Sequence, residues 1–110
     1  MATPEEFFSI DMRIGTVLTA GPFPEARKPS IKLTIDFGPE LGVLASSAQI
    51  TAHYAPETLI GRQVVAAVNL GERRIAGFKS QVLVLGGMPS ATEVVLLRPD
   101  HPLENGTRIG

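Results

Sequence analysis

The sequence predicts a single, mainly β domain built as a five-stranded barrel with short helices. Its 110 residues are 44% hydrophobic, which is enough to bury one core. Apolar residues occupy every second position from Ile31 to Phe37, a pattern typical of an antiparallel strand with one face in water. Glycine and proline interrupt the chain between the apolar runs, as in small barrels and sandwiches. A helix inserted after the third strand is the arrangement of an OB-fold, which binds oligonucleotides across one face.

Strand-like segments follow one another along the chain. They lie at residues 12–20, 30–37, 41–45, 63–70, 81–85 and 93–97. The segments 63–70 and 81–85 are nearly all apolar, which indicates strands buried on both faces. Gly15, inside the first segment, predicts a β-bulge or a close approach of the backbone.

Helical segments are expected at three places. Thr3 is suited to cap a short N-terminal helix, because Pro4 fits the first helical position and Glu6 completes a capping box. Ser46 begins a second capping pattern, with Gln49 three positions on, and predicts a short helix over about 47–54. A further helical turn is expected at 56–61, ending at the glycine. Between strands three and four, this insertion would close the bottom of the barrel.

Composition excludes several classes of function. The formal net charge is -1, so any binding of a polyanion must come from a local basic patch. There is no cysteine, which excludes disulfides, thiolate chemistry and cysteine-ligated zinc. His53 and His101 are far apart, and no carboxylate stands at metal-site spacing from either. We therefore expect no metal and no cofactor.

The sequence also lacks the signs of an enzyme or of a membrane protein. No Ser/His/Asp set, no paired carboxylates and no glycine-rich phosphate loop before a helix is evident. The acidic N-terminus has no apolar h-region, and no run approaches about 18 apolar residues. A cytoplasmic, non-enzymatic protein without a signal peptide or membrane span is expected.

The stretch 69–87 is the candidate working surface, because it contains the densest group of cations in the chain. Arg73, Arg74 and Lys79 are offset there by a single Glu72. Two interpretations are open. Either these cations contact the phosphates of a ligand, or they belong to a solvated hairpin and serve only solubility. The candidate ligand-binding residues, for peptide or tRNA, are Ser47, Asn69, Arg73, Arg74, Phe78, Lys79 and Ser80. Four further cations would extend the patch if the first two strands bring them alongside, namely Arg13, Arg27, Lys28 and Lys32.

Each uncharged candidate has an alternative structural role. Phe78 stacks on a base, lines a pocket for apolar side chains, or lies under the hairpin. Asn69 and Ser80, on two strands expected to pair, either bind a ligand or form hydrogen bonds with each other or with the turn. Ser47 contacts ligand or serves only the helix cap. Aromatic residues make up only 5% of the chain and there is no Trp, which favours a peptide surface over reading of single-stranded nucleic acid.

Several short motifs carry a resemblance to a known family. They are Phe8, Asp11-Met-Arg-Ile-Gly15, Ser46-Ser47, Val68-Asn69-Leu70, Arg74-Ile75-Ala76-Gly77 and Ser80-Gln81-Val82-Leu83. This pattern resembles the tRNA-binding domain of some methionyl-tRNA synthetases, of the bacterial phenylalanyl-tRNA synthetase beta chain and of free-standing structure-selective tRNA-binding proteins. Longer blocks, Phe23-Pro24-Glu25-Ala26-Arg27, Ser46 to Thr51, Arg74 to Phe78 and Val82 to Gly87, resemble the stand-alone CsaA family, described as protein-secretion chaperones.

The resemblance implies an OB-fold over 1–110 whose extensions, 1–10 and 98–110, build a homodimer. Apolar residues near both ends, such as Phe7, Phe8 and Leu103, agree with such an interface. It also implies export chaperoning: binding of unfolded or precursor polypeptides without ATP, with tRNA as a further partner and no DNA. The alternative is a stand-alone structure-selective tRNA-binding protein that uses the same face.

Overall fold

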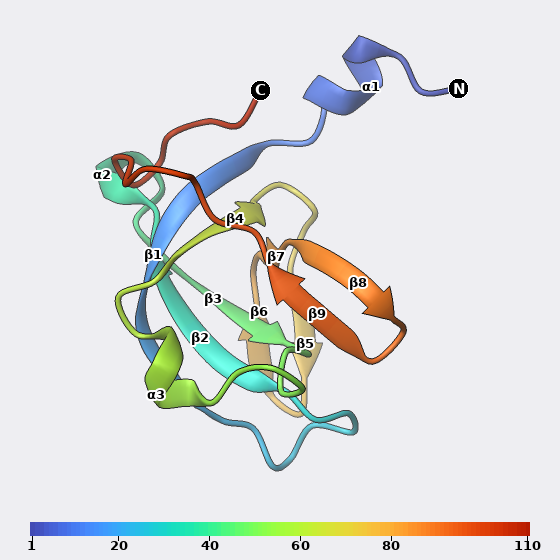
Figure 1. Cartoon of the computed structure of the whole chain (residues 1–110), viewed down its shortest axis with the longest axis vertical. Helices are drawn as coiled ribbons and strands as arrows, with labels where there is room; N and C mark the ends of the chain where they lie inside the picture. Colours follow the sequence, from blue (N-terminus) through green and yellow to red (C-terminus); the bar gives the residue numbers. More distant parts are fainter.

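A computed structural model describes all residues from Met1 to Gly110 (Figure 1). Its centre is a five-stranded antiparallel sheet in the order β3-β2-β1-β4-β7. These strands are β1 (Met12–Pro22), β2 (Ile31–Asp36), β3 (Val43–Ala48), β4 (Gln63–Ala67) and β7 (Leu83–Val84). The sheet curls until its two edges meet, so the fold is the nearly closed OB-fold barrel that the sequence predicts.

The barrel is closed by hydrogen bonds between β3 and the residues before β7. The amides of Gln81 and Val82 donate to the carbonyl of Ala45 at 2.8 and 3.3 Å. In return, the Ala45 amide donates to the side-chain carbonyl oxygen of Gln81 at 3.0 Å. One glutamine side chain therefore supplies a hydrogen bond where the ladder between the edge strands is incomplete.

The core confirms the alternation seen in β2. Ile31, Leu33 and Ile35 are at most 2% exposed, while the residues between them are only partly buried. In β4, the four residues from Val64 to Ala67 are all buried, as expected for a strand covered on both faces. The segment 81–85 differs from the prediction, because Leu83 is 52% exposed between buried neighbours. This strand has one face outside the barrel.

At Gly15 the backbone of β1 lies close against two side chains of the core, those of Ile35 and Phe37. A Cβ atom there would lie 2.6 Å from Ile35 and 2.8 Å from Phe37, so the predicted close backbone approach is confirmed. The irregularity of β1 lies further along, between Val17 and Thr19.

The N-terminal helix α1 (Pro4–Phe8) has the predicted capping box, formed by Thr3 and Glu6. A second one-turn helix, α2 (Gly38–Leu41), follows β2. It ends at Gly42, whose φ of 73° is one that glycine adopts readily. Because this helical turn uses residues up to Leu41, the third strand begins later than predicted, at Val43.

The helix predicted over 47–54 is wrong. Ser46 and Ser47 belong to strand β3, and turns and irregular backbone follow up to Ala55. The hydroxyl of Ser46 donates to the carbonyl of Val82 at 2.9 Å instead of capping a helix. The expected helical turn is present as α3 (Pro56–Leu59), and its Leu59 is fully buried in the barrel core. Of the predicted helical insertion, α3 alone is helical, and it packs on the barrel core through Leu59.

Two hairpins project from the barrel (Figure 1). One consists of β5 (Arg73–Ile75) and β6 (Phe78–Ser80), and the other of β8 (Gly86–Ser90) and β9 (Glu93–Leu96). The sequence predicts β9 but neither β8 nor the strands of the first hairpin. Their short length and glycine content give no period that reveals a strand.

The C-terminal segment runs back along β1 towards the N-terminus. The amide of Ile14 donates to Thr107, and the amide of Ile109 donates to Met12, both at 2.9 Å. The guanidinium of Arg108 donates to the carbonyl of Phe8, so the two ends of the chain lie together while α1 extends away from the barrel (Figure 1). No helix is both long and apolar enough to cross a membrane.

Candidate binding groove

A groove of about 1420 Å³ lies between the two hairpins and the loop that joins β1 to β2. Half of its 28 lining residues are hydrophobic. Leu70, Leu83 and Met88 give it an apolar surface in contact with solvent, since they are 55%, 52% and 62% exposed. Exposed apolar groups concentrated in a hollow are a common feature of sites that bind other molecules.

Cations line the same groove from two separate parts of the chain. Arg73 and Arg74 come from β5, and Arg27 and Lys28 come from the β1–β2 loop. None of these four side chains forms an ion pair. The fold therefore brings Arg27 and Lys28 into the same groove as Arg73 and Arg74, and the groove combines apolar surface with unpaired positive charge.

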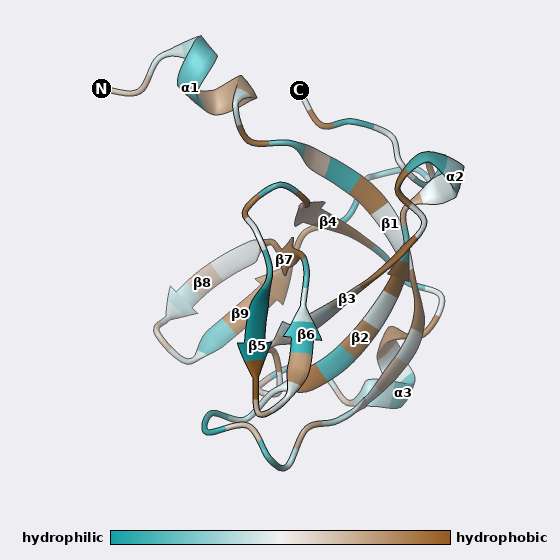
Figure 2. Cartoon of the chain, turned by 180° about the vertical axis from the view of Figure 1, so that it is seen from behind, coloured by the Kyte–Doolittle hydropathy of each residue, from teal (hydrophilic) through white to brown (hydrophobic).

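The β5–β6 hairpin divides its own cations between two faces. Arg74 lies opposite Lys79 and Arg73 opposite Ser80, so Arg74 and Lys79 share one face. Like charges directly opposite each other are unfavourable, and Glu72 reduces this repulsion by pairing with Lys79 at 3.7 Å. Strand β5 is hydrophilic over most of its length (Figure 2). Lys79 does not line the groove.

Phe78 lies beside the groove, not in it. Its half-buried ring meets the buried ring of Phe23 edge-on, with centroids 5.5 Å apart. The ammonium group of Lys32 lies 4.5 Å and 5.3 Å from the centroids of Phe23 and Phe78, respectively. This arrangement corresponds to the ring lying under the hairpin, and it uses Lys32 in a cation–π contact.

Ser47 and Ser80 both line the groove and are joined by a hydrogen bond. The hydroxyl oxygen of Ser80 accepts from the amide of Ser47 at 3.0 Å, and Ser80 is only 9% exposed. This contact connects β3 to β6 at the closure of the barrel. It holds the hairpin that carries Arg73 against the barrel wall.

Asn69 lies outside the groove and binds the N-terminal segment. Its Oδ1 accepts from the Asp11 amide, and its Nδ2 donates to the Ser9 carbonyl, both at 2.8 Å. The expected strands 63–70 and 81–85 do pair, as β4 with β7, but Asn69 lies beyond the end of β4 and Ser80 lies in β6. The two side chains form no hydrogen bond with each other, because Ser80 binds Ser47. Asn69 does not line the groove.

Arg13 is also separate from the groove. Its Nε lies 2.6 Å from a carboxylate oxygen of Asp11, and a second nitrogen donates to the carbonyl of Gly106 at 3.1 Å. The hydrogen bond to Arg13 lowers the pKa of Asp11 below its ordinary value, and burial acts in the opposite direction. The same hydrogen bond raises the pKa of Arg13. Arg13 thus connects the start of β1 to the C-terminal segment.

Of the predicted site residues, the groove contains Ser47, Arg73, Arg74 and Ser80, while Asn69, Phe78 and Lys79 lie outside it. Sequence reasoning predicted an apolar surface beside the cations but did not name the exposed residues that form it, Leu70, Leu83 and Met88. Leu83 could have been found from the register of its strand, since buried neighbours on either side place it outward. Leu70 lies in a bend, and Met88 lies in the short strand β8, where the register shifts between Gly87 and Ser90, so neither carries such a signal.

Comparison with known proteins agrees with the fold. Residues 12–108 match the family described as "Putative tRNA binding domain", and the chain belongs to that family. It is 34% identical to the methionine–tRNA ligase of Methanococcoides burtonii over 113 residues, covering 99% of the chain but 16% of the ligase. The match to the Methanospirillum hungatei ligase is also 34% identical and covers 15% of that enzyme. The chain therefore spans about a sixth of the length of these relatives.

Among solved structures, the chain resembles the CsaA chaperones over its whole length. The chaperone CsaA of Bacillus anthracis is 60% identical with a TM-score of 0.94, and the match covers 100% of this chain and 99% of that one. The CsaA chaperone protein of Picrophilus torridus is 43% identical with a TM-score of 0.92, covering both chains completely. A MetRS related protein of Pyrococcus horikoshii, 25% identical, has a TM-score of 0.88 and is covered over 98% of its length.

Proposed function

We propose that this protein is a CsaA-type chaperone of the cytoplasm that holds unfolded or export-bound polypeptides in the groove without ATP. The observation that carries the proposal is the groove itself, in which Leu70, Leu83 and Met88 are exposed beside unpaired cations. Full-length similarity to the CsaA chaperones supports it.

The groove is suited to short apolar segments of an unfolded chain. Burying one large apolar side chain contributes about 1.5–3 kcal/mol, so two or three such contacts give weak, reversible binding after the cost of ordering the client. The arginines at β5 attract acidic client segments and orient the chain. Because no step of this binding needs nucleotide hydrolysis, release follows from the low affinity alone.

A second ligand, tRNA, is favoured by the unpaired cations and by the family to which the chain belongs. Arg27, Lys28, Arg73 and Arg74 form a local positive surface on a chain of net charge -1. If all four contact phosphates, the logarithm of the binding constant falls with that of the salt concentration with a slope of roughly -3 to -4. Such binding is strong at low salt and modest at physiological salt.

We also propose a homodimer built by residues 1–10 and 98–110. Phe7, Phe8 and Leu103 are 45%, 52% and 42% exposed and lie on segments that meet at one end of the barrel. An isologous interface would cover them and would place two grooves on one particle. Light scattering should give twice the chain mass of 11.7 kDa, and replacing both phenylalanines with Ser should give the monomer.

Peptide and tRNA binding are separated by two kinds of variant. Leu83→Ser should weaken binding of an unfolded apolar peptide about tenfold, measured by fluorescence anisotropy. Val43→Ser is the matched control, because Val43 is 54% exposed but lies outside the groove. Equal losses in both variants, or no binding of the peptide at micromolar protein, would exclude the groove as the client site.

For tRNA, we consider the slope of the logarithm of the binding constant against that of the salt concentration, called the salt slope. The double variant Arg73→Ala/Arg74→Ala should reduce the magnitude of this slope by about 2, since each phosphate contact contributes about 1. Leu83→Ser should leave that slope unchanged. A slope that does not differ between the double variant and the unaltered protein would place tRNA elsewhere.

A further inference from the structure

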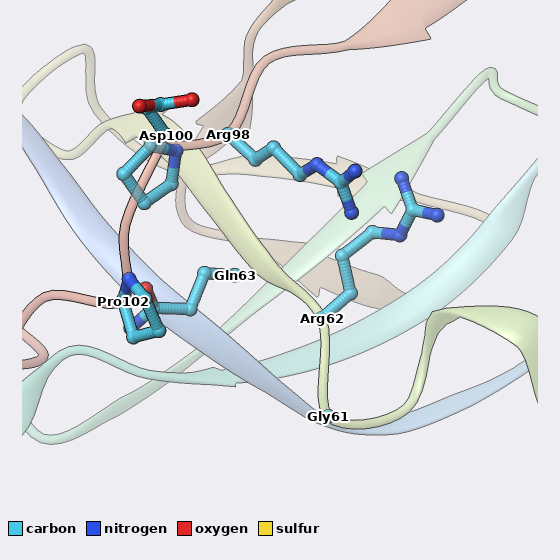
Figure 3. A pocket seen from close by; sticks show the side chains of 7 residues that line it. Gly61, Arg62, Gln63, Arg98, Asp100 and Pro102 are labelled. Atoms are coloured by element: carbon cyan, nitrogen blue, oxygen red, sulfur yellow. The ribbon is translucent and has the colours of Figure 1, made fainter.

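A second pocket, of about 700 Å³, lies between the turn before β4 and the segment that follows β9 (Figure 3). No hydrophobic residue lines it, and it shares no lining residue with the groove. Its position brings together Arg62, at the end of the α3 turn, and Arg98, which is 36 positions later in the sequence. Nothing proposed above for peptide or tRNA uses either residue.

The side chains of Arg62 and Arg98 point toward one another across this pocket (Figure 3). Neither forms an ion pair or donates a side-chain hydrogen bond within the protein, whereas Arg13 and Arg108 do. Two guanidinium groups that converge without a counter-charge repel each other, and they raise the local positive potential. An anion bound between them would relieve this repulsion.

Arg62 is held in place without using its N–H groups. Its guanidinium lies over the ring of Tyr54, 5.2 Å from the centroid. The tyrosine is itself fixed, because its hydroxyl accepts from the amide of Leu96 at 3.0 Å. Stacking on an aromatic face leaves the in-plane N–H groups of an arginine free to form a fork with an oxyanion.

The remaining polar side chains of the pocket cannot fill this role. Gln63 already uses both ends of its amide on Leu103, donating at 2.6 Å and accepting at 3.0 Å. Asp100 is the acidic residue of the lining, but its side chain is 97% exposed, lies 3.3 Å from His101 and points away from the arginines (Figure 3). The unused hydrogen-bonding groups are therefore the guanidinium N–H groups.

We infer that Arg62 and Arg98 form a binding site for a phosphate group, distinct from the groove. Tetrahedral phosphate oxygens accept from two arginine forks at once. A phosphate monoester would balance most of the charge of the two guanidinium groups, and a phosphodiester would balance half of it. The lining offers no large aliphatic or aromatic side chain, which disfavours a peptide C-terminus that ends in a large apolar residue. The phosphate is either a free phosphate monoester or a phosphodiester of an RNA strand.

The first test uses inorganic phosphate and NMR of the arginine side chains. Titration against chloride at constant ionic strength should shift the Nε–Hε signals of Arg62 and Arg98 and should saturate in the millimolar range. Arg98→Gln should weaken this binding at least fivefold; it removes no side-chain hydrogen bond or ion pair within the protein, so we expect the variant to fold. Arg73→Gln/Arg74→Gln, which removes the same kind of charge from the groove, should leave it unchanged.

The inference would be overturned if phosphate shifted the signals of Arg62 and Arg98 no more than chloride does. It would also be overturned if the groove variant lost the phosphate-dependent shifts as much as Arg98→Gln does. Arg62→Lys/Arg98→Lys keeps the charge but loses the forks, so it should bind phosphate several-fold more weakly than the unaltered protein. Undiminished binding by the lysine variant would also contradict the proposed geometry.

The second test identifies the source of the phosphate. If the site receives RNA, Arg98→Gln should reduce the salt slope of tRNA binding by about 1, in addition to the effect of the groove cations. If the slope is unchanged while inorganic phosphate still binds, the site takes a free phosphate monoester. The phosphate titration stands even if tRNA does not bind, so failure of the proposed function and of this inference are distinguishable.

Discussion

The carboxylate of Asp11 and the guanidinium of Arg13 are joined by contacts of 2.6 and 3.2 Å. The pair is partly buried, with side-chain exposures of 25% for the acid and 17% for the arginine. Arg13 also lies 3.3 Å from Glu40. One cation therefore joins the start of β1, the α2 turn and, through Gly106, the C-terminal segment.

The first prediction concerns the acid sensitivity of this pair. The pKa of Asp11 is lower in the folded protein than in the unfolded chain, because Arg13 stabilises the carboxylate. Its contribution to the free energy of unfolding is therefore complete above the unfolded pKa, near 4, and is lost as pH falls through the lower folded pKa. Asp11→Asn should cost up to about 1 kcal/mol at pH 7 and less at pH 2, measured by urea unfolding. An equal cost at both pH values would contradict this account.

The second prediction separates structure from binding at Asn69. Asn69→Ala removes two hydrogen bonds to the N-terminal segment and should lower the free energy of unfolding by about 1–3 kcal/mol. Because Asn69 lies outside the groove, the affinity for an unfolded peptide should stay within about twofold. A large loss of affinity with unchanged stability would make Asn69 a ligand contact, as the sequence suggested.

The third prediction concerns the close approach at Gly15. Gly15→Ala forces a methyl group against Ile35 and Phe37 in the core and should destabilise the fold by about 1–3 kcal/mol. Gly21→Ala is the matched control on the same strand, since nothing lies within 4 Å of its added Cβ. Thermal unfolding of both variants decides the question. Equal melting temperatures would show that the side chains of Ile35 and Phe37 can move to accommodate the added methyl group.

The fourth prediction concerns the turn between β5 and β6. Ala76 has a φ of 47° and is the one non-glycine residue with positive φ, in a two-residue turn completed by Gly77 at 82°. Ala76→Gly should raise the free energy of unfolding by up to about 1 kcal/mol, because it removes the strain of the left-handed conformation. Gly77→Ala should lower it. Chemical unfolding of both variants measures the effect, and a destabilised Ala76→Gly variant would show that unfolded-state entropy outweighs the strain.

Much of the barrel was predictable because its strands carry their own periodicity. The alternation from Ile31 to Phe37 and the apolar run in β4 record which faces are covered, and burial requires those residue types. The capping box at Thr3 is equally local, since both of its partners lie within three residues. The basic hairpin was visible as a cluster of charge at Arg73 and Arg74.

The error at Ser46 and Ser47 shows where local reasoning ends. A serine followed three positions later by glutamine is a good helix start in isolation. Here the hydroxyl of Ser46 and the amide of Ser47 find partners 36 and 33 residues away, and β3 continues through them. Long-range hydrogen bonds of this kind leave no mark on a single sequence.

By itself the sequence determined the alternation of β2, the apolar run of β4, the cluster of charge at Arg73 and Arg74 and the N-terminal capping box, because each depends on near neighbours or on a repeating pattern. Only the tertiary structure decided which groups each cation lies beside. It placed Arg27 and Lys28 beside Arg73 and Arg74, assigned Arg13 to an ion pair and Lys32 to two aromatic rings, and brought Arg62 toward Arg98. The physical reason is that a charge acts through distance in space, and closure of the barrel sets that distance for residues far apart in the chain.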